Sequence, residues 1–280
     1  MRHENCCRKP VRLAIVAGLI SVSLSLSAAV TYDFKQVSQS DFENPADGEI
    51  TGTGFIDGHK SRVEVKTGNM PGSYIIARND TQMLFVVDPL NKRFHEINAA
   101  QVASAFGSSK IQITNFKSNV TRLNDRPIVA DLPTEHLRVT LAYDITVMFG
   151  TLPLRQSVVT TIDKWVTQAY GELTDPALTR GTIRTGNKEI DQMIEAENSK
   201  VKGFPLRQVT TTSTTSMGAE QTAGTKLKMK PVRRQSSELV ITRISPTVVS
   251  PTLFEVPAHY AKVDASHTEE PAVHMINMQP

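Results

Sequence analysis

The stretch "HLRVTLAYDITVMF", residues 136–149, decides the fold of this chain. Every odd-numbered position from 137 to 149 is apolar, and the even positions between them carry mostly polar side chains. This period of two indicates a β-strand, because successive side chains of a strand point to opposite faces. The strand would be roughly 43 Å long at about 3.3 Å per residue step, which exceeds the usual strand length. We therefore expect it to curl within a strongly bent sheet or partial barrel.

The same period of two recurs toward the N-terminus in a series of shorter runs. Turn signals separate these runs, notably Asp57-Gly58, Asn79-Asp80 and "DPLNK" at 88–92. Asp-Gly between two strand-like runs is a strong hairpin signal, because both central residues of the favoured turn have positive φ. The pattern predicts an antiparallel meander of short strands over "YDFKQVSQ" (32–39), "EITGTGFI" (49–56), "HKSRVEVK" (59–66), "SYIIAR" (73–78), "TQMLFVV" (81–87) and "RFHEI" (93–97).

Beyond the long strand, "GTLP" (150–153) is a turn into a second strand at 154–167. Helical periodicity is sparse and is confined to residues 98–106 and residues 187–200. The fold class that follows is mainly β, or α+β, with a strongly bent antiparallel sheet or partial barrel and a few short helices.

Seven consecutive hydroxyl residues, Thr210 to Ser216, raise the question of whether the second half of the chain is a domain or a stalk. Threonine is β-branched and favours strands. Two further strand-like runs follow, "TKLKMK" (225–230) and "ELVITRIS" (238–245), and a mucin-like tract would carry prolines that 206–230 lacks. The run is therefore predicted to be a strand of the same sheet.

The first 29 residues have the layout of a cleaved secretory signal. A basic segment precedes an apolar run, and the small residues Ser27, Ala28 and Ala29 end it. This segment holds four of the 31 basic and one of the 28 acidic residues, so 27 of each remain in the mature chain. A neutral protein has no global electrostatic attraction to nucleic acid. Both cysteines, Cys6 and Cys7, precede the apolar run, so no lipid-accepting cysteine follows it. The expected location is periplasmic or secreted.

Five phrases carry a resemblance to a known family: "VVDPLNKRFHEI" (86–97), "LPTEHLRVT" (132–140), "DKWVT" (163–167), "KGFPLRQVTTT" (202–212) and "PTLFEVPAHY" (251–260). They resemble a family of uncharacterised bacterial secreted proteins, a domain of unknown function similar to the lipoprotein-carrier (Lol-type) half-barrel. The resemblance implies one carrier-like β domain over residues 30–261, in which a curved antiparallel sheet or half-barrel wraps around a few short helices. The last 19 residues, 262–280, show no periodicity and are predicted to be a disordered tail. In carriers of this fold the sheet and helices enclose an apolar cavity for acyl chains.

The leading functional hypothesis is non-catalytic binding of a hydrophobic or acyl-bearing ligand by the concave face of the sheet. The alternating apolar residues would then form the pocket wall, although a plain core needs the same residue types. An envelope protein-interaction module with a filled core is the alternative, with another envelope protein as its partner. The predicted ligand-pocket residues are Leu137, Val139, Leu141, Tyr143, Ile145, Val147, Val158, Ile162 and Trp165, with Phe149 and Val166 beside them.

Catalytic and metal chemistry find little support in the sequence. There is no G-x-S-x-G motif, no cysteine after the signal, and no glycine-rich loop that opens a helix. His95 and Glu96 are adjacent, so in a strand they would point to opposite faces rather than share a metal. His136 is expected to fix the turn after Pro133-Thr134. We therefore predict no enzyme activity, no metal and no cofactor.

Overall fold

The computed structural model describes residues 29–42, 44, 47–98, 111–149, 152–171, 173, 191–192, 195, 199–217 and 232–263. Several sequence predictions fall outside these residues. They are the signal segment up to residue 28, the first helix after Asn98, the strand at 225–230 and the tail from residue 264. Within 187–200, Asp191, Gln192 and Glu195 are helical. No helix among the described residues has the length and apolar character needed to cross a membrane.

Twelve strands form one sheet in the order β14-β6-β5-β4-β3-β2-β1-β13-β12-β11-β10-β7. Two very short strands, β8 and β9, pair separately. The bounds are β1 (Ala29–Ser40), β2 (Gly48–Asp57), β3 (Lys60–Thr67), β4 (Tyr74–Arg78), β5 (Met83–Asp88), β6 (Arg93–Asn98), β7 (Ile111–Arg122), β8 (Ile128–Val129), β9 (Leu132–Pro133), β10 (Glu135–Phe149), β11 (Leu152–Thr167), β12 (Phe204–Met217), β13 (Arg233–Thr247) and β14 (Ala261–Lys262), with a short 3-10 helix, η1 (Pro251–Phe254).

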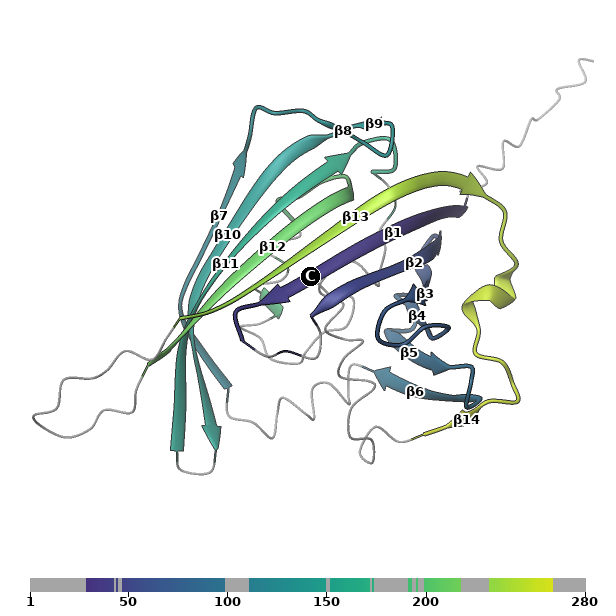
Figure 1. The fold of residues 1–280 in the computed structure, drawn as a ribbon, viewed down its shortest axis with the longest axis horizontal. Helices are drawn as coiled ribbons and strands as arrows, with labels where there is room; N and C mark the ends of the chain where they lie inside the picture. Colours follow the sequence, from purple (N-terminus) through teal and green to yellow (C-terminus); the bar gives the residue numbers. More distant parts are fainter. Residues whose placement is uncertain are drawn as a thin grey trace, which may run out of the picture.

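The predicted long, bent strand is confirmed. β10 has 15 residues and β11 has 16, and Figure 1 shows the long strands as arcs in a curved sheet. Every pairing is antiparallel except that of β14 with β6, which is parallel. Because β7 and β14 lie at the two edges, the sheet of the described residues is open, as a half-barrel requires.

The first hairpin turn lies one residue later than its sequence signal suggests. Asp57 pairs with Lys60, so the two-residue loop consists of Gly58 and His59. Gly58 has φ of +59°, which glycine adopts without the steric cost of a Cβ atom. Asp57 itself ends β2, so the expectation of positive φ at both Asp57 and Gly58 was wrong.

The hydroxyl run forms the second half of β12. Thr210 to Ser216 pair on one side with β11, from Ile162 to Gln156, and Thr210 to Thr214 pair on the other side with β13. The prediction that this run is a strand and not a stalk is confirmed. Alternation along the strand places Thr210, Thr212, Thr214 and Ser216 on one face and the three residues between them on the other.

The C-terminal segment covers one face of β4–β6. Phe254 of η1 is buried with Tyr74 and Ile76 of β4 and Val87 of β5. After η1 the chain adds β14 to the sheet, and the N–H of Val263 donates to the carbonyl of Phe94. The pairing of β14 thus places Ala261 and Lys262 in the sheet, and the predicted boundary at 261 falls within this strand.

Two glycines of β2 allow aromatic side chains of β1 to lie directly on the sheet. Phe34 pairs with Gly52 and Tyr32 pairs with Gly54. A Cβ atom at Gly52 would overlap the carbonyl oxygen of Glu64 and the ring of Phe34, and one at Gly54 would overlap the ring of Tyr32. Both positions therefore require glycine for close packing.

Replacing Gly52 with alanine tests this packing. We expect Gly52→Ala to lower the free energy of unfolding by about 2–3 kcal/mol, as overpacking against fixed backbone does. The matched substitution Thr51→Ala, on the opposite face of β2, is expected to cost less than about 1 kcal/mol. Urea unfolding at neutral pH measures both. Equal, small effects would show that the strand accommodates a methyl group at residue 52.

Candidate functional site

The two faces of the sheet differ in composition, and strand pairing identifies the members of each. Directly opposed residues of neighbouring strands share a face. On β1 the buried positions are Val30, Tyr32, Phe34, Gln36 and Ser38, which alternate with more exposed residues. We call the face that carries these residues the inner face, and the opposite one the outer face.

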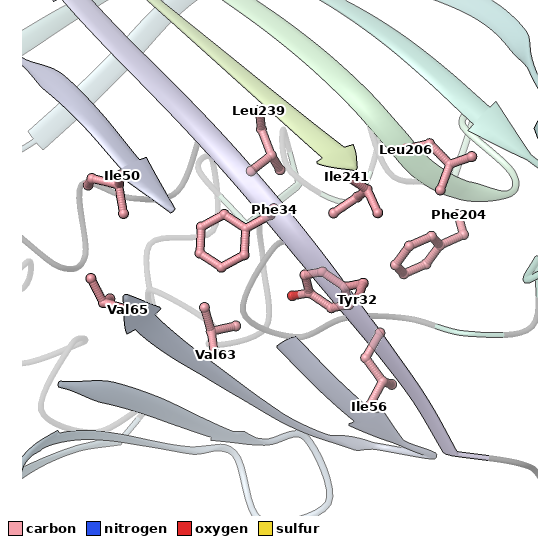
Figure 2. Close-up of a cluster of buried hydrophobic side chains, with 10 residues drawn as sticks. All are labelled: Tyr32, Phe34, Ile50, Ile56, Val63, Val65, Phe204, Leu206, Leu239 and Ile241. Atoms are coloured by element: carbon pink, nitrogen blue, oxygen red, sulfur yellow. The ribbon is translucent and has the colours of Figure 1, made fainter. Parts of the chain in front are cut away.

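The inner face of β1–β3, β12 and β13 holds the largest apolar cluster. Figure 2 shows its side chains, which come from strands far apart in sequence and converge on one region. The Tyr32 ring meets the Phe204 ring edge-on, with 6.3 Å between their centroids. The cluster consists of Tyr32, Phe34, Ile50, Ile56, Val63, Val65, Phe204, Leu206, Leu239 and Ile241. Partly buried residues from the ends of the long strands pack against it, namely Val129, Leu132, Tyr170, Leu173 and Ile244.

The structure places eight of the nine predicted pocket residues on the inner face of β10 and β11. Val139 pairs with Ile162 and Tyr143 pairs with Val158, so the apolar faces of the two strands coincide. Trp165 is the exception, because it pairs with His136 and therefore lies on the outer face. The eight are Leu137, Val139, Leu141, Tyr143, Ile145, Val147, Val158 and Ile162. Val166, predicted beside them, is buried and pairs with Glu135, which places it on the inner face; the side chain of Phe149 lies outside the described residues.

Burial decreases along the inner face of β10. Val139 and Leu141 are buried and pack with Ile162, with Val120 and Val201 beside them. The next three inward residues, Tyr143, Ile145 and Val147, are half-buried. Leu154, opposite Val147 on β11, is 43% exposed. We call Tyr143, Ile145, Val147 and Leu154 the apolar arm.

Leu154 was absent from the predicted site. Every second residue of a strand points to the same face. Leu154 lies four residues before Val158, so it points inward as Val158 and Ile162 do. The sequence analysis placed a turn immediately before Leu154 and did not extend the inward face to it. The register of β10 with β11 shows that the face continues to residue 154.

Polar side chains occupy the inner face between the apolar cluster and the apolar arm. Ser38, Ser237 and Thr210 are directly opposed across β1, β13 and β12. One row further, Thr212 faces Thr160 of β11. Two amides, Gln36 and Gln208, lie on the side nearer the apolar cluster. We call Gln36, Ser38, Thr160, Gln208, Thr210, Thr212 and Ser237 the hydroxyl–amide belt.

The outer face carries a separate polar network around His136, whose side chain is buried. Its Nδ1 lies 2.8 Å from both carboxylate oxygens of Asp125, and its Nε2 lies 2.9 Å from Oδ1 of Asp163. Carboxylates only accept hydrogen bonds, so this geometry suits a ring that donates from both nitrogens. The His136 ring stacks on the Trp165 ring, with 4.2 Å between the two centroids. The guanidinium carbon of Arg207 lies over the Trp165 ring, 4.5 Å from its centroid.

This network holds the segment between β7 and β10, so His136 contacts residues before Pro133 and not only the turn after Pro133-Thr134 that the sequence suggested. Asp125 belongs to that segment, and the backbone N–H of Leu123 donates to the carbonyl of His136. The same segment places Val129 and Leu132 against the apolar cluster. His136 thus attaches the segment that packs over the cluster at this end of the sheet.

Asp163 is the central acceptor of the network. Burial alone would raise its pKa, but hydrogen bonds from Arg138 and His136 outweigh burial and hold the pKa below the ordinary value of 3.8. The guanidinium of Arg138 donates from Nε to one carboxylate oxygen at 2.8 Å and from Nη2 to the other at 3.1 Å. The ionised carboxylate is therefore the form that the fold stabilises.

His95 and Glu96 point to opposite faces, as predicted. His95 is buried on the inner face, where its Nδ1 lacks a hydrogen-bond partner. Glu96 lies on the outer face and pairs with Lys262 at 3.0 Å. Among the described residues, no three histidine, cysteine or acidic side chains are grouped closely enough to hold a metal ion.

Comparison with known proteins finds distant similarity to a solved structure. No family model and no curated protein matches the chain. A LolA superfamily protein from Nitrosomonas europaea is similar over 81% of this chain and 90% of its own, with 11% sequence identity and a TM-score of 0.30.

The stability of the outer-face network should depend on pH through Asp163. The pKa of Asp163 is lowered in the folded protein, so its contribution is present above about pH 4 and is lost as the pH falls through the folded value. We expect Asp163→Asn to reduce the free energy of unfolding at pH 7 by about 1–3 kcal/mol, as for hydrogen bonds to charged groups.

Urea unfolding of the wild type and Asp163→Asn at pH 7 and pH 3 measures this contribution. The difference between the two proteins should be smaller at pH 3 than at pH 7, because pH 3 lies below the ordinary pKa of 3.8 and the stabilisation from a lowered pKa declines below that value. A difference of the same size at both pH values would show that the charge of Asp163 contributes nothing.

Proposed function

We propose that this protein is a non-catalytic, secreted or periplasmic protein that binds a hydrophobic or acyl-bearing molecule on the inner face of its sheet. The observation that carries the proposal is the apolar arm. Its four side chains continue the buried inner face of β10 and β11, yet they are only partly covered. A ligand that covered them would remove apolar surface from water at about 25 cal/mol per Å².

Among the described residues, ion pairs occupy the centre of the outer face. Asp33 accepts hydrogen bonds from Lys66, Arg243 and Thr53. Arg207 pairs with Glu238 at 2.7 Å on the same face. A charged outer face suits solvent, so the contrast between the faces supports ligand binding on the inner one.

The proposal assigns binding without catalysis. His136, the buried histidine of the outer face, has a carboxylate against each ring nitrogen, so neither nitrogen is available to a substrate. This supports a structural role for the most distinctive polar cluster of the described residues.

Secretion is proposed from the signal-like segment that ends at Ala29. β1 begins at Ala29, so cleavage after this residue would leave β1 intact from Val30 onward. Intact-mass measurement of the exported protein tests this directly, since the mature chain should begin at Val30. A mass that includes residues 1–29 would contradict it.

The alternative, an interaction module with a filled core, is favoured by one observation. Close packing of Tyr32 and Phe34 on Gly52 and Gly54 fills the inner face at β1 and β2. If the apolar arm were covered in the same way, no ligand would bind there. The two candidates therefore differ at the arm.

A pair of aspartate substitutions distinguishes them, with N-phenyl-1-naphthylamine as an apolar fluorescent probe. Leu154 and Val159 are both on β11 and are 43% and 44% exposed, but Leu154 lies on the inner face and Val159 on the outer one. We expect Leu154→Asp to weaken probe binding at least about tenfold, because an unpaired charge would face the bound apolar group.

Val159→Asp is the matched control and should bind the probe within about twofold of the wild type, since water already solvates that position. Titration by fluorescence, with circular dichroism to confirm folding, gives both affinities. Equal affinities for the two variants would contradict binding at the arm. Absence of probe binding to the wild type would favour the interaction module.

A further inference from the structure

We propose that the hydroxyl–amide belt binds the uncharged polar head group of a lipid whose acyl chain lies along the apolar arm. The inference rests on the proposed function and names the chemical class of its ligand. An ester of glycerol, such as a monoacylglycerol, has the required chemistry.

The belt is unusual because it is polar, inward-facing and buried. Five of its seven side chains are at most 7% exposed. An ordinary sheet core at these positions would be apolar, because buried hydroxyl and amide groups are costly unless they form hydrogen bonds. The belt side chains form such bonds with one another, so a polar ligand would bind by replacing them.

The hydrogen bonds within the belt are long. Gln36 Nε2 lies 3.5 Å from the Ser38 hydroxyl and 3.4 Å from that of Ser237. Gln208 Nε2 lies 3.3 Å from Thr210 Oγ1, and the hydroxyls of Thr160 and Thr212 are 3.2 Å apart. Hydrogen bonds in proteins are ordinarily about 2.7–3.2 Å long for N–H···O and about 2.5–3.0 Å for O–H···O. Exchanging these weak bonds for bonds to a ligand would therefore lose little.

The belt adjoins the apolar arm in the correct order for an amphipathic ligand. Leu141 pairs with Thr160, which pairs with Thr212, so one row of opposed residues runs from the apolar β10 into the belt. The next inward residue of β10 is Tyr143, the first of the arm. A chain on the arm would thus place its polar end beside Thr160 and Thr212.

The belt side chains are all neutral, which selects the class of head group. Two basic residues lie at its borders: Lys164 faces Gln208, and Arg233 faces Thr214. Neither is within the rows of hydroxyls, and Arg233 is exposed and lies over the ring of Phe42. Neutral donors and acceptors complement hydroxyl and ester groups, so we commit to an uncharged head group.

Head-group preference of the wild-type protein is the first test and needs no substitution. 1-Lauroylglycerol and laurate have the same chain, and each competes with N-phenyl-1-naphthylamine at pH 7.5. We expect 1-lauroylglycerol to bind about tenfold more tightly, as one or two additional hydrogen bonds allow. Equal or tighter binding of laurate would overturn the proposal and indicate an anionic head group.

The second test replaces belt hydroxyls with methyl groups of the same shape. Thr210→Val/Thr212→Val keeps two β-branched strand residues and removes two inward hydroxyls. We expect its affinity for 1-lauroylglycerol to fall about tenfold, while its affinity for the probe, which has no head group, changes less than about twofold.

Thr211→Val/Thr215→Val is the matched control, because these threonines lie on the outer face of the same strand. It should bind both ligands as the wild type does. Unchanged affinity of the inner pair for 1-lauroylglycerol would overturn the head-group assignment while leaving apolar binding intact. Failure of the wild type to bind the probe would instead remove the proposed function itself.

Discussion

The packing of Tyr32 and Phe34 of β1 on Gly52 and Gly54 of β2 is the contact on which the rest of the structure depends. β1 pairs with β2 on one side and with β13 on the other, so it joins the meander of β2–β6 to the long strands β10–β13. Because two positions on β2 lack a Cβ atom, the rings can lie against the backbone and reach side chains of both halves. The sheet is one continuous structure through this contact.

The inner face changes character with distance from this contact. Aromatic and aliphatic side chains surround Tyr32, the amides Gln36 and Gln208 follow, and then the opposed hydroxyls of β1, β13, β12 and β11. The long hairpin of β10 and β11 adds an apolar strip beside the hydroxyls, and that strip is only partly covered. A plain core would be apolar throughout, whereas a surface for an amphipathic molecule needs both zones next to each other.

Local alternation was sufficient to predict the strands and the inward residues of β10, because the period of two holds along its entire length. It also predicted the hydroxyl run as a strand. The prediction of Trp165 as a pocket residue was wrong. The alternation of residues along β11 already places Trp165 on the face opposite that of Val158 and Ile162. The belt was not predictable in this way, since it depends on the register among four strands. Likewise, the hydrogen-bond partners of His136 are Asp125 and Asp163, which only folding brings close to it.

Native mass spectrometry of the mature protein, purified without detergent, tests the central claim that the inner face holds an acyl-bearing molecule. The account predicts an added mass that organic extraction removes and that 1-lauroylglycerol can replace with one bound equivalent. A protein that has only the apoprotein mass, both as purified and after addition of 1-lauroylglycerol, would contradict it and would direct the search to protein partners.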